Sequence, residues 1–354
     1  MTVNNKKIAV AMSGGVDSSM AAALLQGAGH DIFGITMELG IAGAVSPQVD
    51  ARRVADFLGI PHFCVDLQAE FRHDVIDYFT REYQSGRTPN PCIVCNPLIK
   101  FAALYEKARD LGASHLATGH YVRILRQGED LFLAMGVDAQ KDQSYFLSRL
   151  SRDQIERSVF PLGELSKLEI RRQAAAIDLP VATKSDSQEI CFIPDDDYRQ
   201  ALQQWSCDKK GLKAGDFVDA AGTVLGRHRG LANYTIGQRK GLGLALGYPA
   251  YVVSLDSASN RVVVGTEADL FLDQTWVNDC VWNLPQHLQG QATFTCLVKV
   301  RSAAPRIPCQ CHLLSPTKAK IIFETPVRAV TPGQAAAFYQ EECLIGGGFF
   351  TAEG

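Results

Sequence analysis

Residues 7–25 read KIAVAMSGGVDSSMAAALL and decide the fold of the first part of the chain. The apolar run Lys7–Ala11 predicts a buried strand, and Met20–Leu25, built from strong helix formers, predicts a helix. Gly14 and Gly15 between them permit positive φ and a close approach of the backbone to a ligand. The free N–H groups of the first helical turn favour an anion there. The stretch therefore predicts a phosphate-binding turn.

This turn differs from the P-loop of kinases and GTPases, because it lacks the Gly-Lys-Ser/Thr that a P-loop needs. It resembles the S-G-G-x-D-S loop of the ATP pyrophosphatases, which cleave ATP between its α and β phosphates and use AMP to activate an oxygen. An ordinary strand-to-helix turn capped by Ser18 is the alternative. The resemblance implies that ATP is bound by Ala11, Met12, Ser13, Gly14, Gly15, Val16, Asp17 and Ser18.

Composition sets outer bounds on the protein class. The chain has 354 residues, 46% of them apolar and 21% charged, with a formal net charge of −3. This length has room for two or three domains, each with its own core. No apolar stretch approaches the length of a membrane span, and the N-terminus lacks a signal-peptide pattern, so we expect a cytoplasmic protein without a membrane partner. In that compartment the ten cysteines are unlikely to form a disulfide framework.

Strands and helices alternate through residues 1–204. We expect strands at 31–37, 61–67 and 115–121 and helices at 50–58, 70–83, 96–111 and 165–179. This alternation predicts an α/β fold with a doubly wound parallel sheet, whose ligands sit at the carboxyl ends of the strands. Met37 and Gly119 fall at such ends and could line an adenosine pocket; packing at the strand ends is the alternative.

The texture changes near residue 205. Frequent glycines and alternating β-branched residues predict a small β domain over 205–270. Short strands near 292–300, 318–323 and 335–339 predict a β-barrel over 271–354. The predicted architecture is thus an α/β domain followed by two β domains.

The loop Asn90–Cys95 holds a C-x-x-C pair after two prolines and before the helix expected from Asn96. A thiol at a helix start has its thiolate stabilised by the helix dipole, so Cys95 is a candidate reactive residue. The pair alone also fits a redox pair, half a zinc site, part of an iron–sulfur site or two buried thiols. Cys191 lies between apolar residues, which favours a core position.

Motifs along nearly the whole chain carry a closer resemblance. After the phosphate loop come N-P-C-I-V-C-N at 90–96, I-K-F at 99–101, A-T-G-H-Y at 117–121, K-D-Q-S-Y-F at 141–146, Q-E-I-C-F-I at 188–193, Y-T-I-G-Q-R-K-G-L-G at 234–243 and G-G-G at 346–348. In this order they resemble the tRNA-specific 2-thiouridylase family of the ATP pyrophosphatase superfamily. The resemblance implies an adenine nucleotide alpha-hydrolase-like first domain and 2-thiolation of uridine at wobble position 34 of tRNA.

The resemblance also implies a mechanism. ATP, with Mg²⁺, adenylates the uridine C2 oxygen. Sulfur arrives as a persulfide on Cys191 from a donor protein such as a cysteine desulfurase or a relay protein. Cys95 matches the family's nucleophilic cysteine. It either attacks the persulfide to release sulfide, or helps discharge it and leaves a Cys95–Cys191 disulfide that needs reduction.

The partner implied is tRNA, bound through its anticodon stem-loop. A single base must leave its stack to react, so loops are expected to build its pocket. In the family the positions of Asn90, Pro91 and Cys92 face the target base. The family's tRNA contacts fall on His120, Lys141, Asp142, Gln143, Arg301, Ser302 and Gln334.

Two departures from the family pattern stand out. The stretch 38–49 is short, which affects the adenosine side of the pocket. Cys92 stands where persulfide-type members often carry Asp, and with Cys95 and Cys191 it supplies three thiolates, enough to hold a [4Fe–4S] cluster with one open iron. The persulfide route is favoured because it needs only two cysteines.

Two rival functions come from other classes. A small-molecule ATP pyrophosphatase, such as an amidating synthase, explains neither the cysteines nor the β tail. The second rival, a non-catalytic tRNA-binding protein with a structural zinc, does not explain the phosphate loop Ser13–Ser19. Pyrophosphate release measured with and without tRNA separates the three functions.

Overall fold

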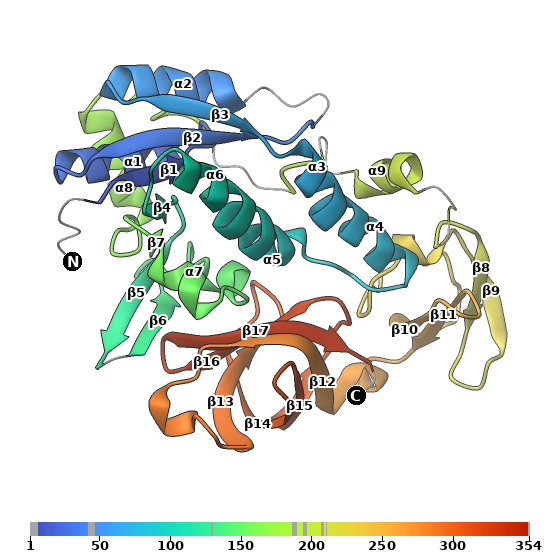
Figure 1. Ribbon diagram of the computed structural model, residues 1–354. Coiled ribbons are helices and arrows are strands. Elements are labelled where there is room, and N and C mark those ends of the chain that lie inside the picture. The colour runs from blue at the N-terminus through green and yellow to red at the C-terminus, as the bar shows by residue number, and fades with distance from the viewer. Residues whose placement is uncertain are drawn as a thin grey trace.

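Three sheets organise the chain in the computed structural model, which describes residues 6–41, 47–128, 130–185, 190–193, 197–206, 209 and 211–352 (Figure 1). The first sheet is wholly parallel, in the order β3-β2-β1-β4-β7. Its strands are β1 (Ile8–Ala11), β2 (Ile32–Glu38), β3 (His62–Asp66), β4 (His115–Ala117) and β7 (Ser158–Val159). The α/β prediction is confirmed, with β4 shorter than expected.

Helices cover both faces of this sheet (Figure 1). Successive side chains of β1 point to opposite faces of the sheet. Ala9 packs with the helices after β3 on one face, and Ile8 and Val10 pack with the helices after β1 and β2 on the other. The helices are α1 (Val16–Gly27), α2 (Pro47–Leu58), α3 (Gln68–Phe71), α4 (Asp77–Gln84), α5 (Pro91–Cys95), α6 (Tyr105–Asp110), α7 (Arg152–Glu156), α8 (Lys167–Ala176) and α9 (Tyr198–Trp205). π-helical stretches at Arg72–Ile76 and Asn96–Leu104 join α3 to α4 and α5 to α6.

The phosphate loop follows the strand β1 at the sheet centre. Because β1 lies between β2 and β4, the segments after the carboxyl ends of these three strands lie side by side. These segments begin at Met12, Leu39 and Thr118. These three segments therefore meet at one edge of the sheet, where the strand–helix alternation predicts that a ligand binds.

The middle sheet has the order β10-β11-β8-β9 and its own small core around Phe217 and Val262. A parallel β11–β8 pairing joins two antiparallel hairpins. The strands are β8 (Gly215–Val218), β9 (Val224–His228), β10 (Tyr251–Asp256) and β11 (Arg261–Gly265).

The C-terminal strands close into a six-stranded barrel, since β12 pairs with both β15 and β17. Closure removes the free edges of an open sheet. The strands are β12 (Phe271–Trp282), β13 (Thr293–Lys299), β14 (Ile307–Ser315), β15 (Lys318–Arg328), β16 (Ala335–Gln340) and β17 (Cys343–Thr351). The predicted β-barrel is confirmed.

One hairpin crosses from the first region to the barrel. Strands β5 (Val122–Gln127) and β6 (Asp130–Met135) extend the barrel sheet, because β6 pairs with β17 at Cys343 and Leu344. Arg123 also forms an ion pair with Glu342. The hairpin therefore fastens the parallel-sheet region to the barrel, which the sequence pattern did not predict.

Candidate functional site

The phosphate loop is held closed by its own serine. The Ser18 hydroxyl accepts from the Ser13 N–H at 3.2 Å and donates to the Gly15 carbonyl at 3.2 Å. Gly14 has φ of 68°, a conformation that only glycine adopts freely. No side chain caps the N-terminus of α1 at Gly15. The N–H groups of its first turn are thus available to an anion, as expected from the sequence.

Asp17, in the first turn of α1, is bound by two residues from elsewhere in the chain. The Lys167 ammonium donates to both carboxylate oxygens at 2.7 and 2.9 Å, and the Tyr121 hydroxyl donates to one of them at 2.6 Å. Only 11% of the Lys167 side chain is exposed. Sequence reasoning missed Lys167; the absence of a lysine from the loop itself is the signal that a cation must come from another segment.

A second lysine reaches the loop from the segment after α8. The Lys184 ammonium donates to the Gly14 carbonyl at 3.0 Å and to the Asp50 carboxylate at 2.6 Å. Positive charge therefore lies on two sides of the loop. A polyphosphate is stabilised by cations close to its oxygens, so this arrangement would suit one.

Gly119 and Met37 lie beside the loop on neighbouring strand ends. A Cβ on Gly119 would lie 2.7 Å from the Ser18 nitrogen, so only glycine fits this approach. Met37 is half-buried near the end of β2 and packs on the main core. Gly119 is thus in close contact with the phosphate loop, whereas the role of Met37 stays a prediction.

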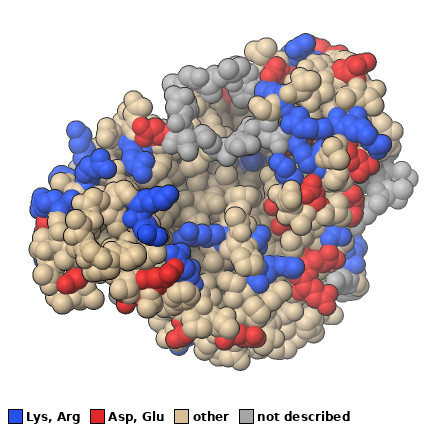
Figure 2. Space-filling view, turned by 180° about the vertical axis from the view of Figure 1, so that it is seen from behind, with Lys and Arg blue, Asp and Glu red and all other residues tan. Residues whose placement is uncertain are grey.

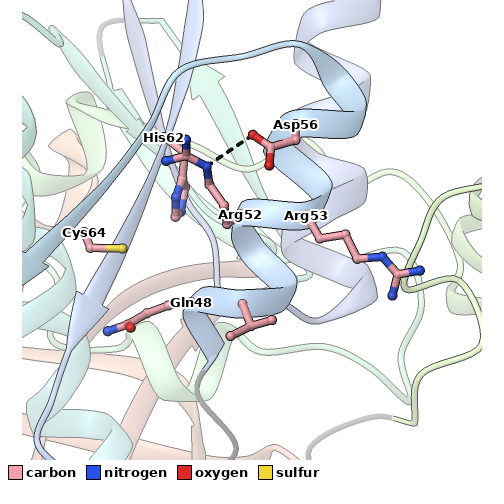
Figure 3. Close-up of a pocket in the computed structure, with 7 residues that line it drawn as sticks. Gln48, Arg52, Arg53, Asp56, His62 and Cys64 are labelled. Atoms are coloured by element: carbon pink, nitrogen blue, oxygen red, sulfur yellow. Dashed lines mark hydrogen bonds and ion pairs between the residues drawn. The ribbon is translucent and has the colours of Figure 1, made fainter.

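A hydrogen-bonded relay supports the loop from behind. The Thr36 hydroxyl donates to the Met12 carbonyl at 2.8 Å and therefore accepts from the Nε2–H of His62, also at 2.8 Å. Burial lowers the pKa of His62, which favours the neutral ring, and the Nε2–H tautomer of that ring serves this relay. His62 also lines a cavity of about 530 Å³ between α2 and β3, together with Gln48, Val49, Arg52, Arg53, Asp56 and Cys64 (Figure 3).

The cysteine loop is a capped helix start. The Asn90 side chain accepts from the Cys92 N–H at 3.2 Å, and Pro91 is the first residue of α5. Cys92 is exposed and Cys95 is buried. The helix continues past Cys95 as a π-helical stretch and then α6, so its free N-terminus is at Pro91 and not at Cys95.

The thiol of Cys95 differs from the reactive thiolate that we expected. Burial raises its pKa to about 12, an effect that the nearby Lys100 ammonium opposes. The helix-start argument for this residue was wrong, because Cys95 ends the first turns of a longer helix that begins at Pro91. The reactivity of Cys95 stays a prediction. Lys100 is a residue whose electrostatic role the sequence reading missed.

Cys92, Cys95 and Cys191 gather near Lys100. The charges of Cys191 and Cys92 raise the pKa of Cys95, and that of Cys92 also raises the pKa of Cys191 after the larger effect of burial. Cys191 is exposed, and desolvation by the surrounding protein raises the pKa of its thiol. Within the described residues, no group of three His, Cys, Asp or Glu is arranged to hold a metal ion. The cluster alternative drawn from the sequence stays a prediction.

The residues expected to touch tRNA near the phosphate loop are mostly engaged inside the protein. His120 is buried and bonds Thr118 at 2.7 Å, and burial holds its pKa well below the usual range. The Asp142 carboxylate accepts from the Gly136 and Ser144 N–H groups. Gln143 accepts from the backbone N–H of Tyr121, and Lys141 is half-exposed.

The expected tRNA contacts in the barrel lie near the cysteine loop. Gln334 donates to the carbonyl of Thr88 at 2.9 Å. Arg301 donates to the Ala329 carbonyl at 3.0 Å and the Thr331 hydroxyl at 2.7 Å. Ser302 beside it is half-exposed.

Comparisons with known proteins agree along the whole chain. Family models match residues 6–195 (tRNA methyl transferase HUP domain), 207–266 (tRNA methyl transferase PRC-barrel domain) and 273–350 (aminomethyltransferase beta-barrel domain). Proteins called tRNA-specific 2-thiouridylase MnmA are 47% identical in Trichlorobacter lovleyi and 44% identical in Lachnoclostridium phytofermentans. The alignments cover 97% of this chain in both cases, and 96% and 99% of the relatives.

The chain belongs to the tRNA-specific 2-thiouridylase family. A further member, from Chloroflexus aurantiacus, is 46% identical over 97% of both chains. The resemblance drawn from the motifs is confirmed. In this 2-thiouridylase chain, no helix of the described residues is long and apolar enough to cross a membrane.

Proposed function

We propose that this chain catalyses the 2-thiolation of uridine 34 in tRNA. One observation carries the proposal: proteins called tRNA-specific 2-thiouridylase are 44% and 47% identical to this chain over 97% of its length. The same chain has an ATP-type phosphate loop and belongs to a family whose members are named for this reaction. An amidating synthase would use the loop but has no role for Cys95 and Cys191.

The first step activates an oxygen that is otherwise a poor leaving group. The uridine O2 attacks the α-phosphorus of ATP, and pyrophosphate leaves with the bonding electron pair. The N–H groups of α1 and the ammonium groups of Lys167 and Lys184 stabilise the charge that builds on the phosphates. Mg²⁺ bound with ATP would neutralise further charge, and Asp17 is the loop carboxylate that could hold it.

The second step replaces the oxygen by sulfur. The terminal sulfur of a Cys191 persulfide attacks C2, and the C2–O bond breaks as AMP leaves. The Cys95 thiolate then attacks Sγ of Cys191, so the S–S bond breaks and its electron pair remains on the sulfur at C2. The products are 2-thiouridine and a Cys95–Cys191 disulfide, which a dithiol reductant returns to two thiols.

This route needs two thiols, a tRNA and a sulfur donor. Lys100 is the cation that favours the Cys95 thiolate. Lys and Arg side chains border a hollow in the middle of one face of the molecule, although the net charge is −3 (Figure 2). Such a border suits a polyanion, and we assign it to the anticodon stem-loop. The persulfide on Cys191 comes from a donor protein of the desulfurase or relay class.

The test is to measure pyrophosphate release and thiouridine formation on the same unmodified tRNA with a persulfide donor. We expect tRNA-dependent pyrophosphate release in the wild type and in Cys95→Ser and Cys191→Ser, because the ATP site uses no thiol. Only the wild type should form 2-thiouridine. Thiolation by Cys191→Ser would overturn the persulfide route, and pyrophosphate release that ignores tRNA would favour a small-molecule substrate.

A further inference from the structure

Thr88, two residues before the cap of the cysteine helix, is bound through all its polar groups to distant parts of the chain. Its N–H donates to the Pro332 carbonyl at 3.0 Å, and its carbonyl accepts from Gln334 at 2.9 Å. Its hydroxyl donates to the Thr235 hydroxyl at 3.3 Å. Thr88, just before the cysteine loop, therefore contacts both the barrel and the region of the middle sheet.

The barrel side of this contact is a tight turn, Thr331–Gln334. The Gln334 N–H donates to the Thr331 carbonyl at 3.1 Å, and Gly333 has φ of 90°. Proline at the second position and glycine at the third are the residues that a type II turn requires. Gly333 and Gln334 each exchange a backbone bond with Phe350 of β17, so the turn is fixed to the barrel wall.

The turn approaches the segment before the cysteine loop so closely that an added Cβ would push against it. A Cβ on Gly333 would lie 3.0 Å from the Cβ of Arg87 and 3.1 Å from the Thr88 nitrogen. Arg87 is itself held by an ion pair with Glu82. A displacement of the turn would therefore be passed to the Thr88 backbone.

Arg301 braces the turn from within the protein. The Thr331 side chain is buried, with 2% of the residue exposed, and its hydroxyl accepts from Arg301 and donates to the Ala329 carbonyl at 3.0 Å. Arg301 also donates to that carbonyl. A hydroxyl at this position thus links the guanidinium to the start of the turn.

The far end of the cysteine helix is attached to the barrel as well. Asn96, directly after Cys95, donates to the Phe146 carbonyl at 2.9 Å. The neighbouring Tyr145 donates to the Ala335 carbonyl on β16 at 3.1 Å. The segment with Cys92 and Cys95 is therefore hydrogen-bonded at Thr88, before it, and at Asn96, after it, to elements that contact the barrel.

We propose that the Thr331–Gln334 turn is a positioning element that sets Cys95 against Cys191. This inference rests on the proposed function for its catalytic consequence, since the meeting of the two thiols matters for sulfur transfer. A misplacement of about 1 Å costs on the order of a hundredfold in rate when two groups must meet. The turn touches neither thiol, so it acts through Thr88.

The experiment compares matched variants of the full chain. Gly333→Ala adds a Cβ against Thr88, whereas Gly290→Ala adds one at a similar φ of 80° with no atom within 4 Å. Thr331→Val removes the braced hydroxyl at nearly constant volume, and Thr331→Ser keeps it. The readout is the rate at which diamide, a two-electron oxidant that accepts two hydrogens, forms the Cys95–Cys191 disulfide, measured by mass spectrometry.

We expect disulfide formation to slow at least about tenfold in Gly333→Ala and Thr331→Val, and thiolation kcat to fall with it. The KM for tRNA should stay near that of Gly290→Ala, and all rates are compared well below the melting temperature of each variant, since Thr331→Val leaves the half-buried Arg301 short of a partner. Thr331→Ser should restore the wild-type rate. Wild-type disulfide rates in both altered variants would overturn the proposal.

The proposal can still be tested if a variant or the proposed function fails. If Gly333→Ala does not fold, the Thr331→Val and Thr331→Ser pair decides alone. If the wild type forms neither thiouridine nor the disulfide, the proposed function fails. The alkylation rate of the exposed Cys92 then reports the position of the loop: a change in Thr331→Val that Thr331→Ser reverses upholds the turn's role, and no change overturns it.

Discussion

At the scale of single residues, the site depends on charges placed by distant segments. Lys167 neutralises Asp17 in the first turn of α1, and Lys100 acts on the thiols of the cysteine helix. Neither lysine belongs to the loop that it serves. Each offers a substitution that separates the ATP step from the sulfur step.

Lys167→Met should lower tRNA-dependent pyrophosphate release by about a hundredfold, because removing one preorganised charge from a phosphate site costs 10²–10³ in rate. The variant also leaves the Asp17 carboxylate without its ion pair. Lys167→Arg should recover part of the rate. Lys107→Met, on an exposed position of α6, is the control and should match the wild type. Full activity of Lys167→Met would show that the Lys167 ammonium does not stabilise ATP.

Asp17→Ala should abolish pyrophosphate release, since it removes the loop carboxylate that orients phosphate or its metal. The fold and the tRNA affinity should be nearly unchanged, because the side-chain partners of Asp17 are Lys167 and Tyr121, which lie outside the barrel. Circular dichroism and filter binding check these two points. Wild-type turnover would show that ATP binds elsewhere.

The pH dependence of the Cys95 thiol follows from its raised pKa of about 12. Because the proton is held more tightly than in an ordinary cysteine, little thiolate exists at neutral pH and alkylation should keep accelerating above pH 9. Lys100→Met removes the opposing cation and should raise the pKa further, which slows alkylation at pH 9. Iodoacetamide labelling followed by mass spectrometry measures this. A plateau below pH 8 would contradict the assignment.

At the scale of elements, the cysteine helix is the most informative segment. Asn90 caps it, Pro91 opens it, and Cys92 lies in the first turn where a negative charge is favoured. Cys95 lies where the α-helix passes into a π-helical stretch, and such bulges are frequent at functional sites.

Cys92→Asp tests whether the third thiol takes part. We expect thiolation to remain within about threefold of wild type, because a carboxylate near a helix N-terminus is stabilised by roughly 0.3–1 kcal/mol and the persulfide route does not use Cys92. Thiouridine content of the tRNA is the measurement, with Cys95→Asp as the inactive comparison. Loss of activity together with loss of bound iron after anaerobic purification would favour the cluster route instead.

At the scale of the whole molecule, three sheets converge on one catalytic segment. The β5–β6 hairpin extends the barrel sheet, and the Thr331–Gln334 turn contacts Thr88. The barrel thus contacts the segment that leads into the cysteine helix. This changes what we expect from Arg301.

Arg301→Ala should leave the salt dependence of tRNA binding unchanged, because the guanidinium bonds Ala329 and Thr331 and burial lowers its pKa. A lost phosphate contact would instead reduce the slope by about one unit. The melting temperature should fall. tRNA binding measured across a range of salt concentrations shows whether Arg301 stabilises the turn or contacts the RNA.

Local physics determined much of this protein from sequence alone. The strand, double glycine and helix at residues 7–25 and the parallel sheet each depend on neighbouring residues, through apolar periodicity and positive φ. The cysteine helix was expected only from Asn96, although the Asn90 cap and Pro91 at its first position are local signals too. The motif order then indicated the family. These features survive in the structure because tertiary packing agrees with local preference.

Tertiary structure alone decided how these parts meet. Lys167 reaches Asp17, Cys191 approaches Cys95, and the barrel turn contacts Thr88 across long separations in sequence. The burial that raises the pKa of Cys95 is likewise a property of everything packed around it. Desolvation and long-range ion pairs depend on which surfaces come together, and no local pattern of residues records that.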